Sequence, residues 1–101
     1  MGVIGFKVLA RERLTPTSAT GFTASLIPPA EVDTAYVVIQ VIAGNMINFC
    51  IDGTTATTLV GDILTKFSKV EVWGAQAMAN FSCIDNGAAC TVECLFMGRG
   101  S

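Results

Sequence analysis

Short apolar runs separated by turn residues dominate this chain of 101 residues. Each run is about five to nine residues long, and several alternate apolar with polar side chains, which is the period of a β-strand. The pattern predicts an all-β fold: a small antiparallel β-sandwich, jelly-roll-like, in a single domain over residues 1–101. Residues 1–13 are expected to form either an extended N-terminal arm or an edge strand. The predicted strands are Gly2–Ala10, Gly21–Ile27, Ala35–Ala43, Met46–Asp52, Lys69–Trp73, Ala77–Ile84 and Ala88–Met97.

Asn86-Gly87 is a strong signal for a two-residue hairpin turn, because both positions tolerate positive φ. Such a turn pairs Cys83 with Cys90 and Phe81 with Val92. Period-two alternation then divides the hairpin into a buried and an outward face. The residues predicted to be buried are Phe81, Cys83, Cys90, Val92, Cys94 and Phe96, and those predicted to face outward are Ser82, Thr91 and Glu93.

The run Met46–Asp52 shows the clearest alternation in the chain, so one of its faces is expected to enter the core. Beyond it, Asp52 and Gly53 predict a turn, since aspartate accepts bonds from following amides and glycine adopts positive φ freely. The segment Thr57–Leu64 is expected to hold at most one helical turn, and Ala30–Thr34 is expected to be a linker after the strand-ending prolines. The residues expected to face the core are Ile47, Phe49 and Ile51, and the outward ones are Asn48, Cys50 and Asp52.

The four cysteines are expected to be thiols that pack as small hydrophobic side chains. No segment has the features of a secretory signal, so synthesis and folding in a reducing cytosol are expected. A late-forming Cys83–Cys90 disulfide remains an alternative. A metal site is disfavoured, because the chain has no histidine and no CxxC pair. No metal and no cofactor are therefore predicted.

The composition predicts a protein that is covered in part by another chain. Only 14% of the residues are charged and 51% are hydrophobic, against roughly 25% and 45–50% in ordinary soluble domains. Self-association is therefore expected, and the alternative is a monomer with a neutral exterior rich in Thr, Ser and Gly. The net charge of −2 disfavours nucleic-acid binding. No run approaches the ~20 apolar residues of a membrane-spanning helix, so no membrane partner is predicted.

The residue types needed for common catalytic sites are missing or scattered. Without histidine there is no Ser–His or Cys–His pair. Nearly all of the eight acidic residues fall at predicted turns or on polar strand faces, and no glycine-rich loop enters a helix. The sequence therefore predicts no enzyme, no catalytic residues and no small-molecule substrate.

Three of the six basic residues lie close together near the N-terminus: Lys7, Arg11 and Arg13. Odd-numbered positions of an extended segment point to one side. The three cations are therefore expected to form one positive edge that contacts an acidic partner.

Several short motifs follow one another in a definite order across the middle of the chain. In order they are Ala35–Val41, Gly44, Ile47–Thr54, Gly61 with Leu64, Val70–Val72 and Ala79–Ile84. This order resembles a family of small tailed-bacteriophage virion proteins, in which a strand and a glycine precede an "IRFRLDGT" strand, a "G..L" segment and a "FRAI" strand. Asn48, Cys50 and Ser82 stand where that family usually carries arginines, so no contacts of those arginines are implied here.

The resemblance implies a structural component of a phage virion, most simply a capsid cement or decoration protein that staples capsid subunits. Its implied partners are the major capsid protein and other copies of itself. Its implied location is the capsid surface, after synthesis in the host cytoplasm. A neck or tail component is an alternative with the same composition. A carbohydrate-binding module is another, although Tyr36 and Trp73 lie inside predicted strands and are expected to be core or interface residues.

Overall fold

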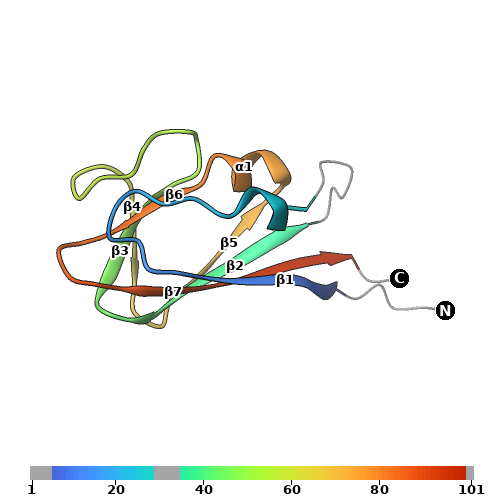
Figure 1. Cartoon of the computed structure of the whole chain (residues 1–101), viewed down its shortest axis with the longest axis horizontal. Coiled ribbons are helices and arrows are strands. Elements are labelled where there is room, and N and C mark those ends of the chain that lie inside the picture. Colours follow the sequence, from blue (N-terminus) through green and yellow to red (C-terminus); the bar gives the residue numbers. More distant parts are fainter. Residues whose placement is uncertain (1–5, 29–34, 100–101) are drawn as a thin grey trace.

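The computed structural model describes residues 6–28 and 35–99 and consists of two antiparallel sheets packed around one core (Figure 1). The predicted all-β sandwich is confirmed. The four-stranded sheet has the order β1 (Phe6–Leu14), β7 (Thr91–Arg99), β2 (Tyr36–Ala43) and β5 (Lys69–Trp73). The three-stranded sheet has the order β4 (Asp62–Thr65), β3 (Met46–Cys50) and β6 (Ser82–Asp85). Two short helices complete the fold, the 3-10 helix η1 (Ala24–Leu26) and α1 (Ala75–Ala79).

Alternating side chains of the two sheets meet in the core. β2 buries every second residue, and β7 does the same from the neighbouring position in the sheet. Full burial of a large apolar side chain stabilises the fold by about 1.5–3 kcal/mol. The four-stranded sheet contributes Val37, Ile39, Val41, Val72, Val92, Cys94 and Phe96, and the three-stranded sheet contributes Ile47, Phe49, Leu64 and Cys83.

The predicted hairpin between the last two strands is wrong, because β6 and β7 belong to different sheets. β6 pairs with β3, whereas β7 pairs with β1 and β2. Gly87 does adopt a positive φ of 85°, but the chain then crosses from one sheet to the other. The pairs Cys83–Cys90 and Phe81–Val92 are therefore not formed. All six residues predicted to be buried are nonetheless buried, because both sheets face the same core.

Two further expectations about elements are corrected. Gly21–Ile27 is not a strand: it contains η1, and only Thr20 just before it bridges to β6. The predicted strand Ala77–Ile84 begins as α1 and becomes a strand only at Ser82. Thr57–Leu64, expected to hold at most one helical turn, forms a tight turn and enters β4. The predicted linker Ala30–Thr34 and the first residues of the predicted strand Gly2–Ala10 lie outside the described residues.

β3 is buried on both faces, not one. Ile47 and Phe49 enter the core as predicted, but Asn48 and Cys50 are also buried, and Ile51 is 43% exposed beyond the end of the strand. The outer face is covered by other segments: Asn86 contacts Asn48, and the carbonyl of Val60 lies 4.0 Å from Cys50 Sγ. The amide oxygen of Asn48 accepts a hydrogen bond of 2.7 Å from Asn86 Nδ2, which makes its burial tolerable.

Candidate binding surfaces

The basic residues predicted to contact a partner lie on β1, which is an edge strand over its whole length. A bulge between Val8 and Ala10 reverses the alternation of the strand. Arg11 and Arg13 pair with Leu95 and Glu93 on the outer face, whereas Lys7 pairs with Gly98, which belongs to the opposite face. The single positive edge predicted from odd-numbered positions is therefore not formed.

Arg11 and Arg13 are already paired within the chain. The guanidinium of Arg13 donates to Glu93 Oε2 from Nη2 at 2.7 Å and from Nε at 3.0 Å. Arg11 Nη1 lies 3.5 Å from the other oxygen of the same carboxylate. The side chain of Glu93 is only 16% exposed between them, so much of the positive charge is compensated before any partner arrives.

An aromatic pair lies on the same outer face of the four-stranded sheet. Tyr36 of β2 is directly opposite Trp73 of β5, and the two rings stack with centroids 4.3 Å apart. The indole Nε1 donates to Glu71 Oε1 at 3.0 Å. Trp73 is 48% exposed, so of the two expected roles, core or interface, the core role is excluded and the interface role stays a prediction.

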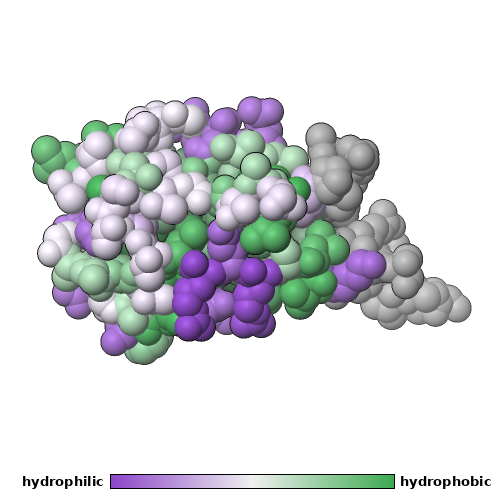
Figure 2. Space-filling view, in the orientation of Figure 1, coloured by the Kyte–Doolittle hydropathy of each residue, from purple (hydrophilic) through white to green (hydrophobic). Residues whose placement is uncertain are grey.

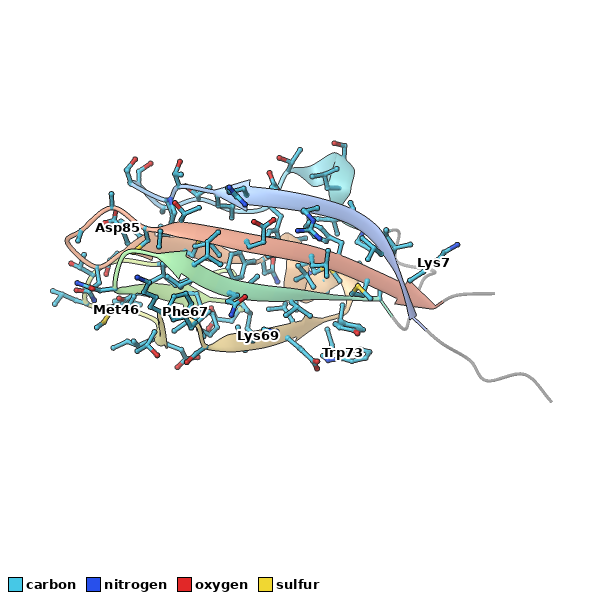
Figure 3. The ribbon with its side chains drawn as sticks, turned by 90° about the horizontal axis from the view of Figure 1, so that it is seen from below. Lys7, Met46, Phe67, Lys69, Trp73 and Asp85 are labelled. Carbon is cyan, nitrogen blue, oxygen red and sulfur yellow. The ribbon has the colours of Figure 1, made fainter. Side chains whose placement is uncertain are left out.

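Figure 3 looks onto this outer face, and no described segment crosses it. We call it the sheet face; its ion pairs join the edge strand β1 to β7, and the apolar Val38 and Leu95 face each other on its two middle strands. Figure 2 shows hydrophilic side chains over the middle of β1 and hydrophobic ones toward the strand's beginning, where Val8 is 55% exposed. The residues that make up the sheet face are Val8, Arg11, Arg13, Tyr36, Val38, Gln40, Lys69, Glu71, Trp73, Glu93, Leu95 and Met97.

A second exposed apolar surface surrounds β4, the outermost strand of the three-stranded sheet. Leu59 is 93% exposed at the tip of a tight turn in which Thr57 and Val60 exchange backbone hydrogen bonds. Ile63 in the strand is 58% exposed. An open hollow of about 370 Å³ lies beside them. Its lining consists of Phe49, Cys50, Ile51, Asp52, Thr54, Val60, Gly61 and Asp62.

Phe67, in the turn from β4 to β5, exposes 66% of its surface although it is a large aromatic residue. Its φ of 69° lies in the left-handed region that side chains other than glycine seldom adopt. The conformation is held by two hydrogen bonds, from the Phe67 amide to Val41 O at 2.7 Å and from Gln40 Nε2 to the Phe67 carbonyl at 3.1 Å. The ammonium group of Lys66 lies 5.0 Å from the centre of the ring.

The cysteines are free thiols and all four are buried, as predicted for Cys83, Cys90 and Cys94, whereas Cys50 was predicted to face outward. Burial raises the pKa of Cys83 to about 12 and raises that of Cys94 as well. Thiolates, which attack disulfides and bind metals, are therefore disfavoured at these two positions. Among the described residues, no group of three or more Cys, Asp or Glu side chains is arranged to hold a metal ion.

The turn after β3 is formed as predicted. Asp52 Oδ1 accepts a hydrogen bond of 3.0 Å from the Thr54 amide, and Gly53 has a φ of 92°. Hydrogen bonds from Thr54 lower the pKa of Asp52. The aspartate is thus occupied in shaping the turn next to the hollow.

Comparison of the chain with protein family models, with curated proteins and with solved structures finds no significant match. None of the helices in the described part of the chain has the length and apolar character required to cross a bilayer. The candidate surfaces therefore have to be interpreted from their own residues.

Sequence patterns did not indicate either Phe67 or the edge of β4. The only local signal was Ile63-Leu64 beside Gly61-Asp62, which is too short to distinguish a strand from a turn. The positive φ of Phe67 has no sequence signature, because it results from contacts with β2.

Proposed function

We propose that this chain is a structural protein of a phage particle, a cement or decoration protein that staples capsid subunits through repeated surface contacts. The proposal rests on the order of motifs that resembles small virion proteins and on the exposed sheet face. A protein that binds only the assembled shell adds its binding free energy to that state, so each occupied site stabilises the capsid. Its partners are the major capsid protein and other copies of itself, on the outside of the particle.

The observation that carries the proposal is the sheet face. Its two middle strands present the half-buried Val38 and Leu95. The more exposed apolar residues lie on its outer strands, with Val8 55% and Trp73 48% exposed. Apolar residues beside compensated charges suit a protein interface, whose apolar contacts give affinity and whose polar groups give orientation. A neck or tail component of the particle has the same requirements and differs in copy number.

The electrostatic part of the proposal now depends mainly on Lys7. Lys7 forms no ion pair with any described residue, whereas Arg11 and Arg13 share Glu93. If Arg11, Arg13 and Glu93 rearrange on docking, an acidic capsid loop can compete with Glu93 for the two guanidinium groups. Lys7, Arg11 and Arg13 therefore stay the candidates for capsid contact.

A mass measurement of purified particles and of their dissociated proteins tests the proposal. We expect this chain in the particles at a copy number related to the number of capsid subunits; a low copy number would indicate the neck or tail.

Adding purified protein back to particles that lack it shows which surface of the protein contacts the capsid. Trp73→Ala, on the sheet face, and Lys7→Glu, on the opposite face of β1, should each lower occupancy, whereas Leu59→Ser, beside the other sheet, should not. Particles that contain none of this chain contradict the proposal.

A carbohydrate-binding module is the second candidate, and the exposed Tyr36–Trp73 pair favours it. Aromatic faces stack on sugar rings, and Glu71 beside the indole supplies a hydrogen-bond acceptor. Glycan binding that disappears with Trp73→Ala would support this candidate over the capsid protein.

A further inference from the structure

The outer edge of β1 is open to another strand. β1 is the last strand of the four-stranded sheet and pairs with β7 on one side. Within the described part of the chain, no strand pairs with its other side, and no amide or carbonyl of a turn or loop bonds to its backbone. An edge of this kind presents N–H and C=O groups that a strand of another chain can use.

The hydrogen-bond pattern of the sheet shows which residues of β1 have outward backbone groups. The carbonyl of Val41 in β2 accepts a hydrogen bond of 2.7 Å from the turn before β5, so it points away from β7. Directions alternate along an antiparallel strand, so Gln40 bonds to β7, where it pairs with Glu93. The next residue of β7, Cys94, then bonds to β1 opposite Glu12. The two neighbours of Glu12 in β1 therefore direct their backbone groups outward.

These neighbours are Arg11 and Arg13, and their side chains, exposed on the sheet face, are not equally satisfied. Glu93 stands directly opposite Arg13 and accepts two hydrogen bonds from it. Arg11 stands opposite the apolar Leu95 and reaches Glu93 only diagonally, at 3.5 Å. A carboxylate opposite Arg11 on the other side of β1 would give this guanidinium a direct cross-strand partner.

The segment nearest to this edge lies on the core side of β1. Glu12 pairs with the buried Cys94, so its side chain points to the core side. There Glu12 Oε1 accepts a hydrogen bond of 2.9 Å from the Thr23 amide, which holds the start of η1 behind the strand (Figures 1 and 3). Ala24 and Ser25 of η1 are exposed and small. A strand added to β1 in the plane of the sheet would therefore pack its core-side residues over η1.

A second copy of β1 does not suit this edge. When the outward residues of two copies pair with each other at these positions, arginine comes to lie opposite arginine, at Arg11, at Arg13 or between them. Like charges directly opposite each other destabilise a pair of strands. The edge therefore disfavours another copy of itself and favours a strand of opposite charge.

We propose that β1 binds an extended acidic segment of another protein, which extends the four-stranded sheet and places an Asp or Glu opposite Arg11. Main-chain hydrogen bonds to Arg11 and Arg13 supply the affinity, and the carboxylate supplies the specificity. The strand order becomes partner-β1-β7-β2-β5. This inference goes beyond the proposed function, because it concerns the edge of the sheet and holds whether or not the partner is a capsid protein.

Amide hydrogen exchange with a peptide probe tests the added strand directly. The probe is a short capped peptide of alternating Thr and Val with a central Glu, and its matched control has Lys at that place. In the free protein the amides of Arg11 and Arg13 should exchange faster than that of Glu12. Millimolar Glu peptide should slow exchange at both arginines about tenfold. The Lys peptide should bind about tenfold more weakly than the Glu peptide.

Variants separate the charge from the backbone. Arg11→Glu should reverse the preference between the two peptides, whereas Lys69→Glu, at the opposite edge of the same sheet, should leave it unchanged. Arg13→Pro removes an outward amide without removing a bond to β7. Arg13→Ala loses the same charge but keeps the amide, so it should bind the Glu peptide about tenfold more tightly than Arg13→Pro. Thermal unfolding of each variant establishes that it is folded.

Three results would overturn the proposal. They are an absence of protection at millimolar Glu peptide, binding that leaves the amides of Arg11 and Arg13 unprotected, and equal binding of the Glu and Lys peptides by the unchanged protein. The second result would mean that the peptide contacts side chains of the sheet face alone. Each result needs only this chain and a peptide, so the proposed function is tested separately.

Discussion

The left-handed conformation of Phe67 is a residue-scale feature that mutation can isolate. A left-handed φ costs a residue with a Cβ roughly 1–2 kcal/mol, while glycine adopts it freely but loses more freedom on folding. Phe67→Gly should therefore be about 0.5–1 kcal/mol more stable than Phe67→Ala. Urea unfolding at a concentration that keeps copies apart measures the difference. Equal stabilities would mean that the turn relaxes to an ordinary conformation.

The buried thiols give a second prediction at the same scale. Burial raises the pKa of Cys83 from 9.0 to about 12. The unfolded chain therefore loses the thiol proton at lower pH than the folded chain, and the free energy of unfolding falls as pH rises from about 9 toward 12. The stability that Cys83 contributes through this shift is complete below pH 9. Cys83→Ala should show a shallower decline in urea midpoint over this range, and an unchanged slope would contradict the assignment.

At the scale of elements, two adjacent residues at the start of β6, Phe81 and Ser82, direct their side chains to opposite faces of the sheet. Phe81 is 3% exposed and stacks on Phe22 with centroids 4.3 Å apart, so Phe81→Ala should cost about 3–5 kcal/mol. Ser82 points the other way, but its Oγ accepts a hydrogen bond of 3.1 Å from the amide of the buried Ala56. Ser82→Ala should therefore cost about 1–3 kcal/mol. Chemical denaturation of both variants measures these costs, and a neutral Ser82→Ala would show that water replaces the hydroxyl.

Strands with long apolar runs were predictable, and the way they combine into sheets was not. The buried face of β7 followed from the alternation of Thr91 to Phe96, whereas β2 is apolar on both faces and its sequence does not specify which one is buried. Asn86-Gly87 predicted a two-residue hairpin turn, but only Gly87 adopts positive φ and the next strand joins the other sheet. The four-residue β4 is too short for periodicity, and η1 depends on Phe22 packing against Phe81 and Phe96. Of the candidate surfaces, only the cations of β1 and the aromatic pair were visible in the sequence. The bulge in β1 places Lys7 on the opposite face of the strand from Arg11 and Arg13, which the sequence did not indicate.

At the scale of the whole molecule, the two candidate surfaces lie on different sheets. The sheet face belongs to the four-stranded sheet, and the apolar surface with Leu59 and Ile63 belongs to the other sheet. Figure 3 separates Phe67 from Trp73 along the length of the molecule. A partner bound to one of these surfaces therefore leaves the other open.

Trp73 is the only tryptophan in the chain, so its fluorescence reports on one surface alone. Iodide reaches a half-exposed indole and quenches it. Quenching that is the same in dilute and in concentrated protein would show that any contact between copies lies away from the sheet face. Docking of the sheet face on a capsid should exclude water and iodide from the indole, reduce quenching and shift emission to shorter wavelength. Quenching that falls with protein concentration alone would instead place the contact between copies on the sheet face.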